Sequence, residues 1–395
     1  MPPAERILIV SQTFPPYNGI GGRRWAKLAK YLCKAGIEIE VICADLGRDK
    51  TSPWTEDVNG VPVFTYEHSF PKILEQFPKS LFDKLNYRLQ VARLKKISKG
   101  TPYDRALLDR DSFLKTFYRR LREFKPHTVV VTGAPFYLLH YALEAKAEFS
   151  DIFFVADFRD PWTWGNSYGY SKLSEKRLLH EKALEENVVA KYNMVLSPWP
   201  SLVNRLQEIY AKFSGKIKLL EHGYDPDDFT IGTAEFENES FDVIFGGTIY
   251  QGMERSLEKI IFQFNQDLRL GIFSNDLHKL RPNAKSVHSG DLISSKDFLN
   301  KVAQSKAVLM LIPFHMKDGI PSKLFEYAYV STPIIAIGHK GSLAEFIETN
   351  QFGIFLEDES QLLEVMIKLP DLEKNDEVLL NYNFEHLTKK LLSFF

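Results

Sequence analysis

Short apolar segments recur along this chain and alternate with stretches of helical periodicity. Segments of this kind, rich in Val and Ile, are typical of strands that are buried on both faces of a parallel sheet. They are residues 6–12, 37–43, 128–132, 152–156, 193–197 and 217–220 in the first half, and residues 241–245, 268–273, 306–312 and 333–337 in the second half. The pattern predicts an α/β chain with two Rossmann-like domains, each built around a doubly wound parallel sheet.

A polar, acidic stretch separates the two series and includes Asp225-Pro226-Asp227-Asp228. A chain of 395 residues has the length of about two ordinary domains. We expect an N-terminal domain over 1–224, a linker over 225–240, a C-terminal domain over 241–376, and a helix over 377–395 that packs back toward the N-terminal domain. Two such domains would face each other across a cleft, and ligands of these sheets bind at the carboxyl ends of the strands.

The composition excludes several classes of protein. Hydrophobic residues make up 44% and charged residues 26%, which is typical of a globular protein, and the formal net charge of −1 gives no overall field that favours nucleic acid. Cys33 and Cys43 lack metal-binding spacing, so we expect neither a zinc site nor a disulfide framework, and a reducing cytoplasm fits. We expect no signal peptide and no membrane-spanning helix, since no stretch reaches about 18 apolar residues.

Glycines follow the first expected strand of each half. Gly21 and Gly22 precede a helix, where free N–H groups and close backbone approach suit an anion, although the motif is not GxGxxG and a plain tight turn also explains it. In the second half, Gly246-Gly247-Thr248 takes the same place, and Arg255 follows at a distance that suits a phosphate contact. A solvated helix arginine remains the alternative for Arg255.

A charged loop follows the expected strand 152–156. It reads Asp157-Phe158-Arg159-Asp160-Pro161-Trp162, so three charged residues lie where an α/β sheet presents its site. Ion pairing within the loop is the alternative interpretation.

The sharpest signal is the segment 317–327, which follows the apolar strand 306–312. Pro321 suits a first helical turn, and Ser322 and Lys323 then offer a hydroxyl, N–H groups and an ammonium to one anion. Glu326 lies one turn along the same face, where a carboxylate accepts hydrogen bonds from a ribose. This spacing suits a nucleoside diphosphate, and an ordinary capped surface helix is the alternative.

With these motifs in order, the chain resembles the retaining GT-B glycosyltransferases of family 4 type over nearly its whole length. The resemblance rests on FPPYNGIGGRRWAKLAKYL, LLEHGYDPDDF, PSKLFEYAYVSTPIIAIG and LAEFIETNQFGIFL. It implies transfer of a sugar from a nucleotide-diphosphate donor, a UDP-sugar being favoured, to a glycan or lipid-linked acceptor of a bacterial cell-surface polysaccharide. It also implies that the domain over 1–224 binds the acceptor and that the domain over 241–376 binds the nucleotide sugar. Retention of anomeric configuration and the lack of a metal or other cofactor are further implications.

The resemblance assigns roles to individual residues. Glu326 matches the ribose-binding, second glutamate of the family's E-x7-E motif, Ser322 and Lys323 match the diphosphate contacts, and Asp291 follows a glycine in the loop that borders the base. The residues assigned to the donor are Gly21, Gly22, Thr248, Arg255, Asp291, Gly319, Ile320, Pro321, Ser322, Lys323 and Glu326; those assigned to catalysis are Arg159, Asp160 and Asp318.

Three positions depart from the family pattern. Asp318 replaces the first glutamate of E-x7-E, which leaves the identity of the sugar open. Arg159 followed by Asp160 stands where the family often has His, and Thr248 stands where it often has Arg. Lys323, Arg255 and the N–H groups of residues 319–323 would then neutralise the leaving diphosphate.

The segment 72–99 is basic and interleaved with apolar residues, a profile that suits an anionic membrane surface. Its members are Lys72, Lys79, Lys84, Arg88, Arg93, Lys95, Lys96 and Lys99 with Ile73, Leu74, Phe77, Leu81, Phe82, Leu85, Leu89 and Leu94. We expect a peripheral enzyme at the cytoplasmic face of the membrane, and a solvated helix is the alternative.

Other functions remain open. A GT-B-shaped nucleotide-sugar epimerase would use a catalytic His, and His222 follows a strand. A noncatalytic glycan- or nucleotide-binding partner of a synthase complex is a further alternative, whereas a dehydrogenase is disfavoured because no GxGxxG fingerprint is present. The residues do not specify the donor base, the sugar or the acceptor.

Overall fold

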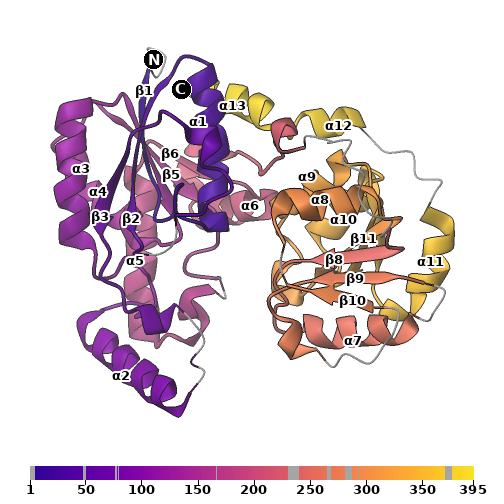
Figure 1. Cartoon of the computed structure of the whole chain (residues 1–395). Helices are drawn as coiled ribbons and strands as arrows, with labels where there is room; N and C mark the ends of the chain where they lie inside the picture. The colour runs from indigo at the N-terminus through magenta and orange to yellow at the C-terminus, as the bar shows by residue number, and fades with distance from the viewer. Residues whose placement is uncertain are drawn as a thin grey trace. The chain divides into compact units, whose positions relative to one another are not determined.

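The computed structural model of the chain describes residues 5–47, 50–75, 78, 80–165, 167–229, 240–264, 268–280, 287–291, 293–369 and 376–395. The chain divides into two compact units (Figure 1). Unit 1 comprises Met1–Glu221 and Thr388–Phe395, and unit 2 comprises His222–Leu387. Most of the expected linker 225–240 lies outside the described residues, which resume at residue 240.

Unit 1 is built on a parallel sheet of seven described strands in the order β3-β2-β1-β4-β5-β6-β7. This is the Rossmann order, in which successive strands are added on one side of β1 as far as β3 and on its other side from β4 onward. The strands are β1 (Arg6–Val10), β2 (Glu38–Asp45), β3 (Val63–Glu67), β4 (Thr128–Gly133), β5 (Phe153–Phe158), β6 (Met194–Ser197) and β7 (Ile217–Leu219).

Helices cover both faces of this sheet. They are α1 (Arg23–Lys34), α2 (Leu81–Ile97), α3 (Arg110–Phe124), α4 (Tyr137–Lys146), α5 (Glu175–Lys191) and α6 (Pro200–Ile209), with short 3-10 turns η1 (Ile20–Gly22), η2 (Glu56–Val58), η3 (Lys72–Leu74), η4 (Ser167–Lys172) and η5 (Ala211–Lys216). Helix α2 is the exception, because it lies away from the sheet at one end of the unit (Figure 1).

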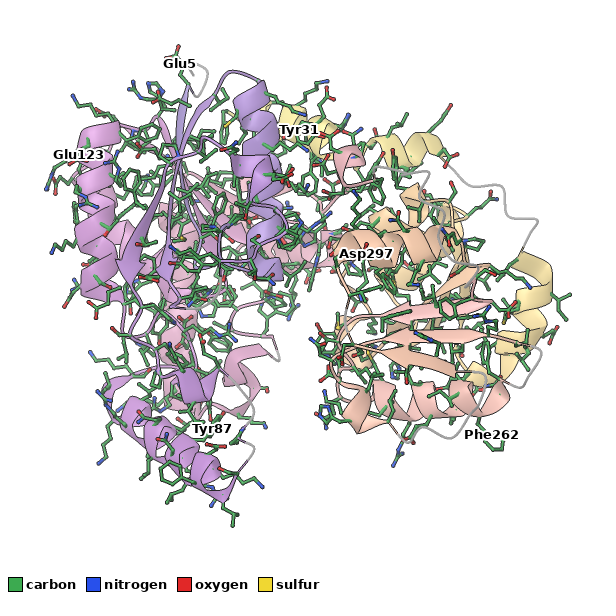
Figure 2. All side chains as sticks on the ribbon, viewed as in Figure 1. Glu5, Tyr31, Tyr87, Glu123, Phe262 and Asp297 are labelled. Atoms are coloured by element: carbon green, nitrogen blue, oxygen red, sulfur yellow. The ribbon has the colours of Figure 1, made fainter. Side chains whose placement is uncertain are left out.

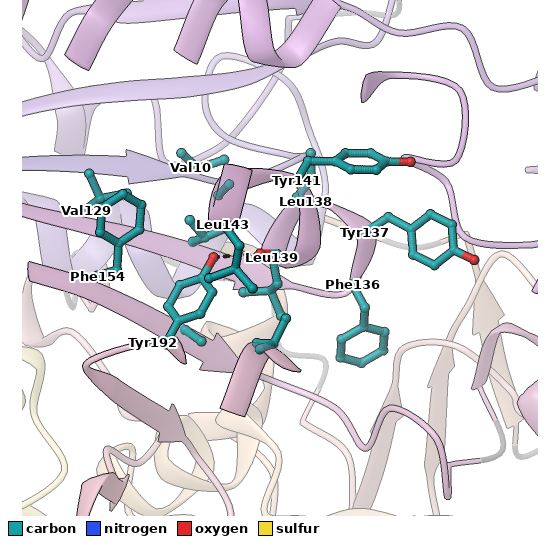
Figure 3. Close-up of a cluster of buried hydrophobic side chains, with 14 of the residues drawn as sticks. Val10, Val129, Phe136, Tyr137, Leu138, Leu139, Tyr141, Leu143, Phe154 and Tyr192 are labelled. Carbon is teal, nitrogen blue, oxygen red and sulfur yellow. Dashed lines mark hydrogen bonds between the residues drawn. The ribbon is translucent and has the colours of Figure 1, made fainter. Parts of the chain in front are cut away.

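The core of unit 1 is rich in aromatic side chains, which accounts for much of the chain's high Phe and Tyr content. Phe154 on β5 and Tyr192 after α5 are fully buried, and the Tyr192 hydroxyl donates to the Leu139 carbonyl at 2.9 Å (Figure 3). The residues of α4 that face the sheet, among them Leu138 and Leu139, complete this cluster.

Unit 2 repeats the architecture with six described parallel strands in the order β10-β9-β8-β11-β12-β13. They are β8 (Val243–Gly246), β9 (Leu270–Phe273), β10 (Val287–Gly290), β11 (Ala307–Ile312), β12 (Ile334–Gly338) and β13 (Gly353–Leu356). The helices are α7 (Met253–Gln263), α8 (Ser295–Ala303), α9 (Ser322–Tyr329), α10 (Ser342–Thr349), α11 (Leu362–Lys368) and α12 (Asp376–Leu380). Helix α13 (Phe384–Leu392) begins in unit 2, and its residues from Thr388 onward belong to unit 1. The 3-10 turns are η6 (Pro226–Asp228), η7 (Leu277–Lys279), η8 (Phe314–Met316) and η9 (Glu359–Gln361).

Alternate residues of the strands in unit 2 pack into two separate cores. On β11, Leu309 and Leu311 join the core beneath α7 and α11, whereas Val308, Met310 and Ile312 join the core beneath α8, α9 and α10. A strand buried on both faces must be apolar at every position, which is why the sequence AVLMLI is continuous rather than alternating.

Each of the expected strands forms, and three strands escaped prediction. Strands β3, β10 and β13 each lie at a sheet edge and are short, so their sequences lack a long apolar run. The segment 377–395, expected as one helix, forms two helices, α12 and α13, because residues 381–383 interrupt it. Its packing toward the N-terminal domain stays a prediction. In the described part of the chain, no helix has the length and apolar character needed to cross a membrane.

Candidate functional site

The glycine loop of unit 1 folds back on the residues that follow β1. Residues Ile20–Gly22 form the turn η1, closed by a hydrogen bond from the Gly22 N–H to the Gly19 carbonyl at 2.9 Å. A β-carbon at Gly22 would lie 2.9 Å from the Thr13 carbonyl oxygen, so only glycine fits this close backbone contact. The loop therefore brings the start of α1 directly over the carboxyl end of β1.

A buried ion pair then fixes the first turn of α1. The Arg24 guanidinium lies 3.3 Å from both Asp157 carboxylate oxygens and donates to the Leu220 and Glu221 carbonyls at 2.6 Å. The Trp25 indole N–H donates to Asp157 at 2.7 Å, and Asp157 is fully buried. Sequence reasoning had placed Asp157 among the charged residues of the site loop, whereas the structure uses its carboxylate to tie α1 to β5.

Arg159 crosslinks two loops at the same sheet edge. Its guanidinium donates to the carbonyls of Gly21 and Ala134, and its Nε lies 3.3 Å from the Gly133 carbonyl. The predicted catalytic Arg159 thus supports the glycine loop, and direct contact with a substrate stays a prediction. Asp160 is half-buried, and burial raises the pKa of its carboxyl against the opposing charge of Arg159.

In unit 2 the structure brings Gly247 and Lys323 together. The Lys323 ammonium donates to the Gly246 carbonyl at 3.2 Å, and a β-carbon at Gly247 would lie 2.9 Å from its Nζ. Gly247 also has a φ of 122°, a backbone conformation that other residues rarely adopt. Burial lowers the pKa of the half-buried Lys323, partly offset by the charge of Glu326.

Helix α9 begins where the sequence predicts, and one assigned N–H group already has a partner. Pro321 is the N-cap rather than a first-turn residue, and Ser322 starts the helix. The first N–H groups of a helix lack intrahelical partners, so those of Ser322 and Lys323 suit an anion. The Gly319 N–H donates to the Met316 carbonyl at 3.1 Å, and its assignment to the donor stays a prediction.

Asp318 and Glu326 have different surroundings. The exposed Asp318 carboxylate accepts from the Ser342 N–H at 3.3 Å and therefore lies at the N-terminus of α10. Glu326 is half-buried on α9, one turn after Lys323. Ile320 is buried beside them and packs into the core, so it can contribute only backbone groups to a ligand.

The other residues assigned to the donor are exposed. Thr248 lies in the loop after β8, and Asp291 directly follows β10. Arg255 lies on α7, where, among the described residues, it lines a depression with Lys259, Phe262 and Asp358. The structure therefore groups Lys323 with the β8–α7 loop, whereas Arg255 lines the depression with Asp358; its phosphate contact stays a prediction.

Sequence reasoning missed the residues that hold these loops. Asp276 accepts from the Ile249 N–H at 3.1 Å, and Lys279 donates to the Ile249 carbonyl at 2.8 Å, so this pair fixes the loop that carries Thr248. In unit 1, the buried Asp104 accepts from the N–H groups of Phe136 and Tyr137. Nothing local in the sequence marks these residues, because their partners are backbone groups far along the chain.

Comparison with solved structures identifies the fold. Sucrose-phosphate synthase from Thermosynechococcus elongatus is similar with a TM-score of 0.66 at 12% identity, over 98% of this chain and 97% of that chain. Trehalose-6-phosphate synthase from E. coli, solved with UDP-2-fluoro glucose, gives 0.63 at 12% identity and 98% of each chain. UDP-GlcNAc 2-epimerase from Neisseria meningitidis, bound to UDP-GlcNAc, gives 0.55 at 13% identity, over 98% and 99%.

No family model matches the chain, and no curated protein sequence matches it significantly. The similar structures nevertheless extend over nearly the full length of both chains and share two Rossmann-like parallel sheets. The chain therefore has the GT-B fold, which it shares with glycosyltransferases and with UDP-GlcNAc 2-epimerases.

Proposed function

We propose that this protein is a glycosyltransferase that moves a sugar from a nucleotide-diphosphate donor, with a UDP-sugar favoured, onto a glycan or lipid-linked acceptor. The observation that carries the proposal is the group formed by Lys323, Gly247 and the N-terminus of α9, with Glu326 one turn further. Unit 2 then binds the donor, and unit 1 binds the acceptor.

The chemistry of this group fits a leaving diphosphate. A half-buried ammonium next to helix N–H groups is already oriented before a ligand arrives, so it stabilises negative charge without reorganisation. Burial lowers the pKa of Lys323 and Glu326 offsets this only in part, so a phosphate would supply further counter-charge. In this proposal the Glu326 carboxylate accepts hydrogen bonds from the ribose hydroxyls.

The finer features of the reaction are part of the proposal. We infer a retaining transfer without metal, with Asp318 facing the donor sugar and Asp160 near the acceptor. Lys323 and the N-terminus of α9 supply the positive charge that a metal provides in other transferases. The product would belong to a bacterial cell-surface polysaccharide.

The test is the turnover of Lys323→Ala. Removing one preorganised donor from such a site lowers kcat by about 100- to 1000-fold. Lys296→Ala on α8 serves as the control, because this exposed lysine lies outside the proposed site. Full turnover by Lys323→Ala would remove the basis of the proposal.

An epimerase is the second candidate, because the similar structures include UDP-GlcNAc 2-epimerases. His222 would be its catalytic histidine, and an epimerase would convert UDP-GlcNAc without any acceptor. Incubation with the donor alone separates the two activities. A noncatalytic binding partner is the third candidate, and slow hydrolysis of the donor by the protein would argue against it.

We also propose that α2 docks on an anionic membrane at its cytoplasmic face. Its inner side, with Val91 and Leu94, is buried against the unit. Large apolar side chains on its other side are exposed to solvent: Leu81 by 85%, Phe82 by 77%, Leu85 by 57% and Leu89 by 60%. The helix therefore has two apolar faces; Tyr87 marks it in Figure 2.

The charges on α2 favour anionic lipid. The single acidic residue of α2, Asp83, forms a capping box with Ser80 at the helix start. The basic residues of α2 are all exposed, and they are Lys84, Arg88, Arg93, Lys95 and Lys96. Apolar insertion together with basic side chains is the pattern of an interfacial helix. Of the basic, apolar segment 72–99, Phe77 and Lys79 lie outside the described residues, and Leu94 is buried.

Flotation with vesicles tests this docking. The wild type should float with vesicles rich in phosphatidylglycerol and not with phosphatidylcholine vesicles. The triple variant Phe82→Ser, Leu85→Ser, Leu89→Ser should stay in solution. Ile97→Ser should float, because it changes an exposed residue that is not among the apolar side chains proposed to insert. Wild-type protein that stays in solution with both kinds of vesicle would refute the docking.

A further inference from the structure

Helix α5 carries two glutamates whose side chains are fully buried, Glu181 and Glu185. Both oxygens of Glu181 accept hydrogen bonds. Its Oε1 accepts from the Thr101 N–H at 2.6 Å and from the Tyr137 hydroxyl at 2.7 Å. Its Oε2 accepts from the Trp162 indole N–H at 2.9 Å. The three donors come from three segments: the loop after α2, the start of α4 and the loop after β5.

The surrounding chain is built closely around this carboxylate. A β-carbon at Gly100 would lie 1.8 Å from the Glu181 Oε1, so the loop after α2 can approach only with glycine there. A buried carboxylate is unfavourable unless it is fully hydrogen-bonded, and an apolar side chain would fill the same space at less cost. We therefore explain the glutamate at this position by the orientation that its three hydrogen bonds impose on the three segments that donate them.

The residue that Glu181 orients lies two positions after Asp160. Trp162 is fully buried and stacks on Phe136, with ring centroids 4.8 Å apart and an interplanar angle of 8°. Glu185 accepts from the next N–H along, that of Thr163, at 3.0 Å. On the other side of Asp160, Arg159 is bonded to Gly21 and Ala134. The loop that carries Asp160 is thus held at both ends.

We propose that Glu181 is a positioning residue for the reaction: through Trp162 it fixes the loop 159–163, and thereby Arg159 and Asp160, at the carboxyl edge of the sheet. This role rests on the proposed transferase function. Glu181 contacts no substrate in this scheme, so its loss acts on kcat through the loop. Most of the residues assigned to the donor lie in unit 2, so the affinity for the donor should change much less than kcat does.

Glu181→Gln is the test variant, because it keeps the shape of the side chain. Its amide NH2 group cannot accept, so one of the hydrogen bonds from Trp162 or Tyr137 is lost. Glu186→Gln, an exposed neighbour on the same helix, is the matched control. The chain has five tryptophans, so the Trp162 indole N–H is one of few signals in a ¹H–¹⁵N spectrum, and Trp162→Phe assigns it. This signal reports on the loop without any activity measurement.

We expect Glu181→Gln to shift the Trp162 indole signal and to lower kcat about tenfold to a hundredfold, the effect of misplacing a catalytic group by roughly an ångström. The KM for the UDP-sugar should stay within about twofold, and Glu186→Gln should change nothing. Trp162→Phe keeps the stack but removes the donor, so it should lower kcat in the same way even if Glu181→Gln does not fold.

Two outcomes overturn the proposal. An unshifted indole signal in folded Glu181→Gln would show that Glu181 does not orient Trp162. A shifted signal with unchanged kcat would show that the network is structural only. If the wild type transfers no sugar, the transferase function fails, whereas the indole signal still tests whether Glu181 holds the loop.

Discussion

Replacing Gly247 by alanine perturbs the backbone and the Lys323 ammonium together. Gly247 has a φ of 122°, and holding another residue in so sparsely populated a conformation costs about 1–3 kcal/mol of stability. The new β-carbon would lie 2.9 Å from the Lys323 Nζ. Because that atom ends a flexible side chain, we expect the ammonium to move away rather than the fold to fail.

The displaced ammonium would then lose the contact proposed for it with the donor diphosphate. A hydrogen bond to a charged group contributes about 1.5–3 kcal/mol, which corresponds to a roughly 10- to 100-fold weaker Kd. Gly36→Ala is the matched control, because Gly36 has a φ of 83° with open space around it. Both variants should lose similar stability, and only Gly247→Ala should lose donor affinity.

The assay is isothermal titration of a UDP-sugar into both variants, with thermal unfolding in parallel. If Gly247→Ala binds the donor as tightly as Gly36→Ala does, Lys323 does not contact the diphosphate from its position beside Gly247. If neither variant is less stable than the wild type, the backbone argument for glycine at these positions is wrong.

Three further predictions concern unit 1. Burial lowers the pKa of His68, but its bonds and charge interactions with Asp109 and Glu75 outweigh this and raise the pKa to about 9. The stability that the protonated ring contributes should therefore be complete below pH 6.5 and fall by up to about 3 kcal/mol as the pH rises to 9. His68→Gln should flatten this pH dependence in urea melts. Asp157→Asn should destabilise unit 1 by about 3–5 kcal/mol in the same melts, because it leaves the buried Arg24 without its counter-charge. Gly22→Ala should lower both the melting temperature and kcat, since the glycine loop must move away from the backbone of Thr13.

The fold was predictable because its signal is local. A strand such as β11 is apolar at every position, since both of its faces are buried, and that pattern is visible in six consecutive residues. The edge strand β3, with the sequence VFTYE, is half exposed and carries no such pattern. The start of α9 was predictable for the same reason, because Ser322, Lys323 and Glu326 lie within one turn.

The support of the site was not predictable, because it depends on residues far apart in sequence. Lys323 meets Gly246, 77 residues away, only after β8 and β11 pair in the sheet. Arg159 bonds to carbonyl groups, which every residue has, so no side-chain pattern marks its partners. The sequence of α2 likewise shows its apolar residues but not that Leu94 faces inward and Phe82 outward.

The most direct test of the donor site is titration of UDP-, GDP- and ADP-sugars into the wild type and into Lys323→Ala. The structure predicts that one of these donors, a UDP-sugar foremost, binds the wild type and binds Lys323→Ala about 10- to 100-fold more weakly. Equal affinity for both proteins, or no binding of any nucleotide sugar to the wild type, would contradict a donor site at the start of α9.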